Sequence, residues 1–363
     1  MTEPAPLQQV KRTYVRQRGR TLSYFGGCDY FRLGSHPAVL AALRVGLRRY
    51  GLNVAASRLT TGNHRLYELL EAKLAQFFRV QSALLASNGY LPNLMVAQAL
   101  AGEFSHALID ERAHGSLADA AQFLDCPIVK FKHRDADDLA RHFRRLGKNT
   151  KLIVLTDGMF SHDGSIVPLR AYLDALPPNA VLLVDDSHGA GVLGKNGRGT
   201  AEHVGIATQR IIQTITLSKA FGVYGGAVLG TTALRKKIIA RSRVVVGNTP
   251  LPLPLANAAL QSLEVLRTDR RLRWRLADNT QYVKSALRKA GVPVEETPSP
   301  IVALIPHRAA DVARLKQQLL ARKIFPSFIR YPGGPKTGYF RFTISSEHTR
   351  RQLDDLVNAL TSG

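Results

Sequence analysis

The chain has 363 residues, of which 50 are lysine or arginine and 27 are aspartate or glutamate, so its formal net charge is +23. Hydrophobic residues make up 45% of the chain and charged residues 21%, which is typical of a globular protein and excludes a disordered or fibrous one. The length suits two domains, and no uncharged apolar stretch reaches the roughly 18 residues that would predict a membrane span.

The N-terminal part of the chain contains a short run of alternating polar and apolar residues, and two helical patterns follow it. Residues 20–25 alternate as a strand does and stop at a pair of glycines. Apolar residues then recur at helical spacing over 36–45 and again over 66–74. We expect residues 1–35 to form an N-terminal segment ahead of the first domain.

Short apolar runs then alternate with helical patterns, which predicts buried strands separated by helices. These runs are 82–86, 107–109, 151–155, 180–184 and 210–215. A mostly parallel sheet with helices on both faces accounts for strands of this kind. We therefore predict an α/β fold whose larger domain spans residues 36–250.

Prolines at 250, 252 and 254 interrupt this pattern, and a smaller domain is expected after them. The elements expected there are a long helical segment at 255–290, strands at 301–305 and 339–344, and a last helix at 348–361. Residues 251–363 should therefore form a C-terminal α/β domain.

The excess of positive charge predicts an anionic partner. Basic residues are spread along the chain without a long lysine or arginine tract, so we expect no specific nucleic-acid binding. The densest cluster places five arginines around Trp274, at 267, 270, 271, 273 and 275, with the spacing of a solvent-exposed helix face. A phosphorylated cofactor, a coenzyme A thioester or an acidic carrier protein would each suit the charge.

Cysteine usage and the N-terminal residues point to one compartment. Cys28 and Cys126 are too few for a disulfide framework or a four-thiolate zinc site. The first twenty residues are rich in arginine and have no apolar core, unlike a secretory signal. We expect a cytoplasmic protein without a metal site.

Polar side chains follow the predicted strands, which is where open α/β sheets bind ligands. Asp185 and His188 follow the strand at 180–184, and they fit either a shared crevice or a capped turn. Lys219 follows the next strand and precedes a glycine-rich turn. Burial there would lower the pKa of the Lys219 amine and free it for Schiff-base chemistry, whereas an exposed loop lysine is the plainer alternative.

A third segment, Asn88, Gly89 and Tyr90, lies between a predicted strand and a helical pattern. Backbone amides at such a helix start can bind phosphate. Asn-Gly is also an ordinary turn sequence, so this segment alone is a weak signal.

Together these segments resemble the α-oxoamine synthases, pyridoxal-phosphate enzymes of fold type I that join an amino acid to an acyl thioester and release carbon dioxide. The resemblance runs from about residue 20 to residue 360. Further motifs in the same order support it, namely 59–62, 110–114, 156–164, 194–199 and 341–348. It implies a fold-type I transferase with a large, mostly parallel-sheet domain and a smaller C-terminal α/β domain.

The resemblance also implies a catalytic set of Lys219, Asp185, His114 and His188. Lys219 would bond to pyridoxal 5′-phosphate and later take the substrate's α-proton. Asp185 would pair with the cofactor's ring nitrogen, and His114 would stack on the ring. His188 and Ser161 would lie near the phenolic oxygen.

Phosphate and substrate contacts are implied in the same way. The phosphate would rest on the backbone of Asn88, Gly89 and Tyr90, on the Thr216 hydroxyl, and on Thr249 of a neighbouring subunit, so a homodimer with shared active sites is expected. Arg341 would grip the carboxylate of the amino acid, for which a guanidinium fork is well shaped.

Two residues depart from the family pattern. Cys28 stands where the family has an asparagine that helps hold the substrate carboxylate, and Tyr67 stands where many members have histidine. A thiol is a weak hydrogen-bond partner, so the loss at position 28 would cost about 1.5–3 kcal/mol of binding. The alternative is that Cys28 is simply a packed side chain.

A decarboxylating acyltransferase, first of all the synthase type used in biotin biosynthesis, is the leading interpretation. The nearest alternatives are a glycine C-acetyltransferase or another α-oxoamine synthase, and then an aminotransferase or racemase on the same fold. A non-enzymatic basic binding protein is disfavoured because the motifs occur as a set. Neither the acyl chain nor the choice between coenzyme A and carrier protein follows from the sequence.

Overall fold

The computed structural model describes residues 5–147, 149–207, 209–330, 334–335 and 337–362. They form two compact units. The larger unit comprises His36–Phe160 and Ile166–Thr268, and the smaller unit comprises the residues up to Ser35, the segment Ser161–Ser165 and the residues from Asp269 onward. Contacts between residues define these two units. They do not test the expected domains 1–35, 36–250 and 251–363, which stay a prediction.

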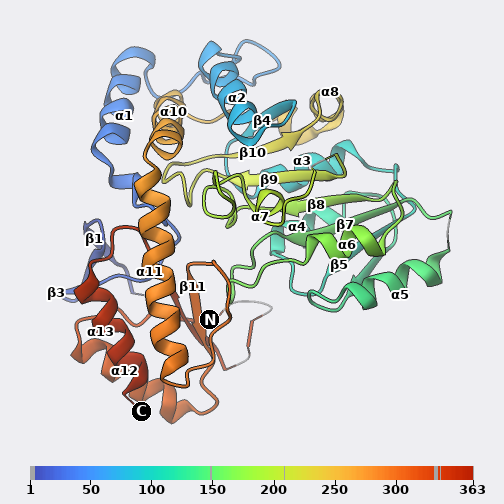
Figure 1. Ribbon diagram of the computed structural model, residues 1–363. Coiled ribbons are helices and arrows are strands. Elements are labelled where there is room, and N and C mark those ends of the chain that lie inside the picture. Colours follow the sequence, from blue (N-terminus) through green and yellow to red (C-terminus); the bar gives the residue numbers. More distant parts are fainter. Residues whose placement is uncertain (1–4, 148, 208, 331–333, 336, 363) are drawn as a thin grey trace. The chain divides into compact units, whose positions relative to one another are not determined.

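A seven-stranded sheet forms the centre of the larger unit (Figure 1). Its order is β4-β10-β9-β8-β7-β5-β6; β10 runs antiparallel to both of its neighbours, β4 and β9, and the pairs from β9 to β6 are parallel. The strands are β4 (Ser82–Ala86), β5 (His106–Asp110), β6 (Ile128–Phe131), β7 (Leu152–Asp157), β8 (Val181–Asp185), β9 (Ile211–Thr216) and β10 (Gly226–Gly230). The expected mostly parallel, buried sheet is therefore confirmed.

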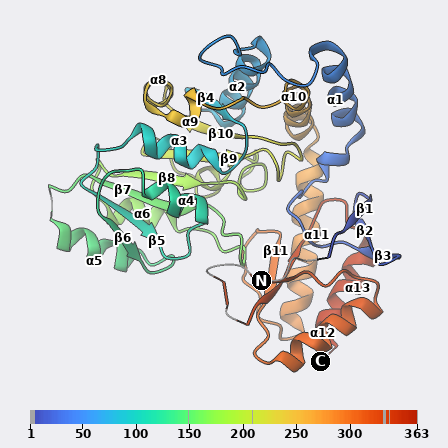
Figure 2. The same cartoon turned by 180° about the vertical axis from the view of Figure 1, so that it is seen from behind.

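Helices cover both faces of this sheet because successive strand residues point to opposite sides. Ile109 and Leu155 belong to the core cluster that includes α3 (Leu91–Ala99), α4 (Gly115–Ala121) and α8 (Thr232–Arg241). Leu108 and Val154 belong to the cluster with α5 (Ala136–Leu146), α6 (Leu169–Ala175) and α7 (Thr200–His203). Figure 2 turns the view to the face that carries α3 and α4.

Four more helices complete the larger unit: α1 (Pro37–Tyr50), α2 (Arg65–Phe78), α9 (Arg243–Val246) and α10 (Leu253–Thr268). Helix α1 packs on α10 at Gly46, where an added Cβ would lie 2.8 Å from Pro254 Cα. The long helical segment expected over 255–290 is two helices, because Asp269 ends one and caps the next. Its side chain accepts a hydrogen bond from the Arg271 amide (2.9 Å), and α11 (Arg270–Lys289) starts there.

The smaller unit contains two three-stranded sheets and three α-helices among its described residues. One sheet is β1 (Gln8–Lys11), β2 (Tyr14–Gln17) and β3 (Arg20–Ser23), and the other is β11 (Ile301–Leu304), β13 (Tyr339–Thr343) and β12 (Phe328–Ile329). Its helices are α11, α12 (Ala309–Ala321) and α13 (Arg350–Thr361), after a short 3-10 turn at Leu33–Ser35. Val283, Phe340 and Leu353 lie in its core, each completely buried.

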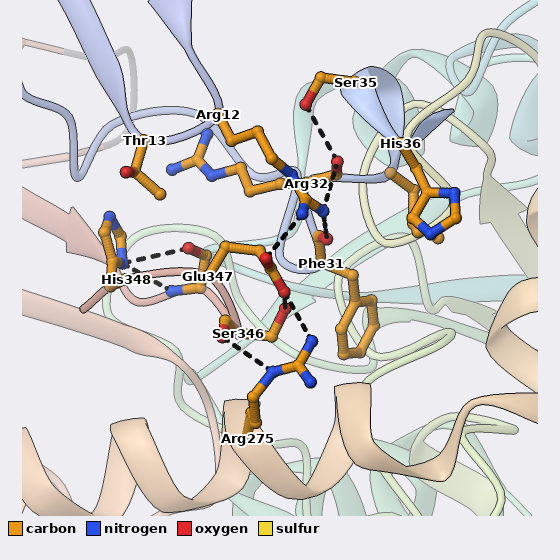
Figure 3. A network of polar contacts seen from close by, with 12 residues as sticks. Arg12, Thr13, Phe31, Arg32, Ser35, His36, Arg275, Ser346, Glu347 and His348 are labelled. Carbon is orange, nitrogen blue, oxygen red and sulfur yellow. Dashed lines mark hydrogen bonds and ion pairs between the residues drawn. The ribbon is translucent and has the colours of Figure 1, made fainter. Parts of the chain in front are cut away.

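Glu347 ties three parts of the smaller unit together (Figure 3). Its carboxylate accepts hydrogen bonds from Arg12 Nη1 and from Arg275 Nη2, both at 2.7 Å. Arg12 also donates to the backbone oxygens of Phe31 and Arg32. The N-terminal segment is thereby fixed to α11 and to the residues that follow β13.

None of the helices in the described part of the chain has the length and apolar character of a membrane-spanning helix.

Candidate active site

One cavity of the larger unit lies where the parallel strands end, and it brings together most of the predicted cofactor residues. Its lining residues are Gly89, Tyr90, His114, Asp157, Asp185, Ser187, His188, Thr216 and Lys219. Asp157, Asp185 and Thr216 are the last residues of β7, β8 and β9. The cavity therefore occupies the edge at which open α/β sheets bind ligands.

Asp185 is buried and held by hydrogen bonds to both carboxylate oxygens. Oδ1 accepts from the Ser187 amide (3.0 Å), and Oδ2 accepts from Asn93 Nδ2 (2.7 Å) and Ser116 Oγ (3.4 Å). Asn93 is completely buried, and its own oxygen accepts from Thr214 Oγ1 (2.6 Å). These contacts fix the orientation of the Asp185 carboxyl group at the edge of the cavity.

A second carboxyl group, Asp157, lies beside Asp185, because the two residues are in register on neighbouring strands. Burial and the nearby Asp185 carboxylate raise the pKa of Asp157 well above its usual value, and a hydrogen bond from the His114 amide (2.8 Å) opposes that shift. Two adjacent carboxyl groups in a buried site do not both ionise readily. The raised pKa of Asp157 therefore opposes a second negative charge beside Asp185.

His114 caps helix α4 and borders the cavity. Its Nδ1 accepts a hydrogen bond from the Ser116 amide (3.2 Å). Burial lowers the pKa of His114, and nearby Lys219 lowers it further while Asp185 raises it. The imidazole is consequently neutral at neutral pH and can pack flat against an aromatic ring without carrying a charge.

Gly89 and Thr216 form a close backbone-to-side-chain contact in the cavity wall. A Cβ at position 89 would lie 2.4 Å from Thr216 Oγ1, so only glycine fits there. The amides of Tyr90 and Leu91 donate to Asn88 Oδ1, at 2.9 and 3.3 Å. The Asn88 side chain thus binds two amides at the start of α3. Asn88 itself does not line the cavity, whereas Gly89, Tyr90 and Thr216 do.

Lys219 sits in a tightly bonded turn after β9. Its carbonyl accepts from the Gly222 amide (2.9 Å), and Leu217 exchanges backbone hydrogen bonds with Val223 and Gly225. The side chain is half-buried and lines the same cavity as Asp157 and His114. Its charge lowers the pKa of both groups. The amine is therefore held among the cavity's ionisable side chains.

The remaining predicted residues lie elsewhere. Thr249 belongs to the larger unit but does not line this cavity. Ser161, Cys28 and Arg341 belong to the smaller unit, where the structure places them together. Arg341 Nη1 donates to the Ser161 carbonyl (3.0 Å), and Nη2 lies 4.0 Å from Cys28 Sγ.

Tyr67, at the second departure from the family pattern, is buried in the larger unit. Its hydroxyl donates to the Leu251 carbonyl (2.6 Å), and the Arg58 guanidinium lies 5.2 Å from the centre of its ring. Burial raises the pKa of Tyr67 to about 12. Tyr67 thus connects α2 to the residues just before α10.

Sequence reasoning gave no role to Asp157, Ser187, Asn93 or Ser116. Asp157 could have been found, because it closely follows the predicted strand at 151–155, as Asp185 follows the predicted strand at 180–184. Asn93 and Ser116 carry no such signal, since each lies near the start of a helix where a polar residue is ordinary. Among the residues that the structure describes, no group of three His, Cys, Asp or Glu side chains could hold a metal ion.

Asp157→Asn should remove a pH-dependent contribution to stability. Because the folded-state pKa of Asp157 is raised, the native protein keeps a proton that the unfolded chain releases above its usual pKa near 3.8. Asp157 therefore stabilises the fold fully below that value, and this contribution is lost as pH rises through the folded pKa. Asparagine keeps an oxygen for the His114 amide but does not titrate.

The free energy of unfolding, measured by urea titration from mildly acidic to neutral pH, should fall more steeply with pH in the wild type than in Asp157→Asn. Asp137→Asn, at an exposed position of α5, should keep the wild-type slope. Identical slopes for the wild type and Asp157→Asn would show that Asp157 is ionised in the folded protein.

Comparison with known proteins agrees with this geometry. The family model described as aminotransferase class I and II matches residues 29–360. The 8-amino-7-oxononanoate synthase of Thioalkalivibrio sulfidiphilus is 38% identical over 345 residues, which are 94% of this chain and 88% of that protein.

Solved structures agree as well. A serine palmitoyltransferase from S. paucimobilis with bound PLP–myriocin aldimine superposes with a TM-score of 0.92 at 28% identity, over 98% of this chain and 90% of that chain. The 8-amino-7-oxononanoate synthase from Francisella tularensis gives a TM-score of 0.81 at 27% identity, over 94% of this chain and 97% of that chain. The fold-type I architecture and the pyridoxal-phosphate cofactor expected from the sequence are thus confirmed. The chain belongs to the class I and II aminotransferase family and, within it, to the α-oxoamine synthases.

Proposed function

We propose that this enzyme condenses an amino acid with an acyl thioester, with release of carbon dioxide, and that its activity is that of an 8-amino-7-oxononanoate synthase. The observation that carries the proposal is the cavity in which Lys219, Asp185 and His114 meet. Its place in a chain 38% identical to a synthase of that name supports the specific activity.

The lining residues suit pyridoxal phosphate. The Gly89–Thr216 contact leaves backbone and a hydroxyl, without an intervening side chain, for a phosphate group. Asp185 offers an anionic oxygen, held in place by Ser187 and Asn93, to a protonated ring nitrogen. When bound, the cofactor supplies an electron sink for the carbon that loses its proton and forms the new bond.

The chain's own residues bind, orient and move protons. Lys219 Nζ would hold the cofactor, and the Lys219 amine would take the proton from the amino acid's Cα. Asp185 would pair with the protonated ring nitrogen, and His114 would pack on the ring. Asp157 accepts a hydrogen bond from the His114 amide, and its raised pKa opposes a second negative charge beside Asp185.

Ser161 and His188 complete the proposed cofactor contacts, near the phenolic oxygen. Arg341 binds the carboxylate of the amino acid through a guanidinium fork, with one nitrogen already directed by the Ser161 carbonyl. This fork would fix the orientation of the bound carboxylate.

We also propose a homodimer in which the partner subunit's Thr249 reaches the phosphate. Thr249 does not line the cavity of its own chain, and nearby Val246 is 52% exposed, which suits a segment that meets a second chain. The free thiols of Cys28 and Cys126 support a reducing, cytoplasmic setting. The net charge of +23 suits an anionic acyl donor such as a coenzyme A thioester.

Release of carbon dioxide from a carboxyl-labelled amino acid tests the reaction. The label should be released only when an acyl thioester is present, and a screen of amino acids and acyl chains should give alanine with a long ω-carboxylated thioester as the best pair. Lys219→Ala should release none, and borohydride should fix the cofactor to the peptide that contains Lys219 in the wild type. Glycine with a short acyl chain as the best pair would assign a glycine C-acetyltransferase, and amino-group transfer to a keto acid without label release would assign an aminotransferase.

Cys28→Asn should strengthen amino-acid binding. The Cys28 sulfur lies at the far limit of hydrogen bonding to Arg341, and an amide would offer both an acceptor to Arg341 and donors to a carboxylate. The dissociation constant of the amino acid, measured by spectral titration of the holoenzyme, should fall by roughly tenfold, while the absorption of the bound cofactor stays the same. Cys126→Asn is the matched control and should change neither. Unchanged affinity in Cys28→Asn would assign Cys28 a packing role.

A further inference from the structure

The segment Ser161–Ser165 leaves the larger unit and packs within the smaller one. The His162 ring lies 6.0 Å from the ring of Tyr339, on the same strand as Arg341. Gly164 has a φ of +78°, and a Cβ there would lie 2.2 Å from Ser299 Oγ. The segment thus follows one narrow path, with Ser161 at the end that meets Arg341.

Lys284, on α11, is a buried lysine that the proposed reaction does not use. It is 3% exposed, and its Nζ donates to both the carbonyl and the hydroxyl oxygen of Thr297, each at 3.0 Å. Burial lowers the pKa of Lys284 to about 8; Glu295 and Asp163 oppose that shift, and Arg288 adds to it. Burying an amine costs free energy unless it is hydrogen-bonded. The two bonds to Thr297 therefore indicate that Lys284 attaches α11 to Thr297 and does not merely fill space.

Thr297 links Lys284 to the segment Ser161–Ser165. Its hydroxyl has a single proton, and Lys284 already donates to its oxygen, so that proton is directed to another acceptor. The acceptor is the Gly164 carbonyl, 3.4 Å away. Asp163, next to Gly164, is near enough to raise the pKa of Lys284. The segment is therefore linked to α11 at Gly164, through Thr297.

We propose that Lys284 is a positioning residue for amino-acid binding, which anchors Ser161–Ser165 so that the Ser161 carbonyl holds Arg341 in its binding orientation. The inference rests on the proposed role of Arg341 as the carboxylate ligand. Lys284 itself touches neither substrate nor cofactor. Its removal should weaken amino-acid binding and loosen the segment, and it should leave the chemistry of the bound amino acid almost unchanged.

The test compares Lys284→Met, Lys284→Arg and Thr297→Val with Lys289→Met, a control at an exposed position of the same helix. Two quantities are measured on the holoenzyme: the dissociation constant of the amino acid by spectral titration, and hydrogen–deuterium exchange of the peptide covering 160–167. Lys284→Met and Thr297→Val should speed exchange in that peptide and raise the dissociation constant roughly three- to tenfold, with kcat at saturation within about twofold of wild type. Lys284→Arg should restore both quantities at least in part, and Lys289→Met should match the wild type.

Faster exchange with unchanged amino-acid affinity would overturn the proposal, because the segment would then be anchored without positioning Arg341. Unchanged exchange in both Lys284→Met and Thr297→Val would overturn it as well. If Lys284→Met does not fold, Thr297→Val decides by the same two readouts. Arg341→Ala separates this inference from the proposed function. Wild-type affinity in that variant would reject Arg341 as the carboxylate ligand, whereas lost affinity there with wild-type affinity in Thr297→Val would reject only the role of Lys284.

Discussion

Two carboxyl groups in register at the ends of β7 and β8 impose the constraint on which the active site depends. Asp157 and Asp185 are both buried, and burial together with the charge of Asp185 raises the pKa of Asp157. The raised pKa of Asp157 opposes a second negative charge beside Asp185, and the contacts from Asn93, Ser116 and Ser187 fix the orientation of the Asp185 carboxyl group. Strand register thus places the two carboxyl groups side by side and makes their pKa values depend on each other.

The same edge of the sheet supplies further residues that line the cavity. Thr216 ends β9, Lys219 follows in a turn held by backbone hydrogen bonds, and His114 is placed by its cap on α4. The Thr216 and His114 side chains are oriented by hydrogen bonds to neighbouring groups, so little ordering of these two remains to be done when a ligand binds. In the smaller unit, Arg341 is held by a hydrogen bond to Ser161, in the segment Ser161–Ser165.

Much of the fold could be predicted because buried parallel strands consist of continuous apolar runs, as in β7 and β8. Strand β6 escaped notice because it is only half-buried and contains Lys130. The break at Asp269 was missed since apolar periodicity continues on both sides of it. The passage of 161–165 into the smaller unit depends on packing against residues far along the chain, such as Ser299, and no local pattern encodes such a contact. In the cavity, motif spacing located Asp185 and Lys219, but the buried partners Asn93 and Ser116 could be recognised only from coordinates.

Exchange of the amino acid's α-hydrogen with deuterated water in the holoenzyme, without acyl thioester, tests the central claim most directly. The account makes Asp185 the partner of the ring nitrogen, so Asp185→Asn should slow exchange by about a hundredfold or more, because an amide cannot keep the ring nitrogen protonated. The pKa of Asp157 is raised, so an amide there should change the charge of the site little, and Asp157→Asn should stay within a few-fold of wild type. Near-wild-type exchange in Asp185→Asn, or an equal loss in Asp157→Asn, would contradict the account.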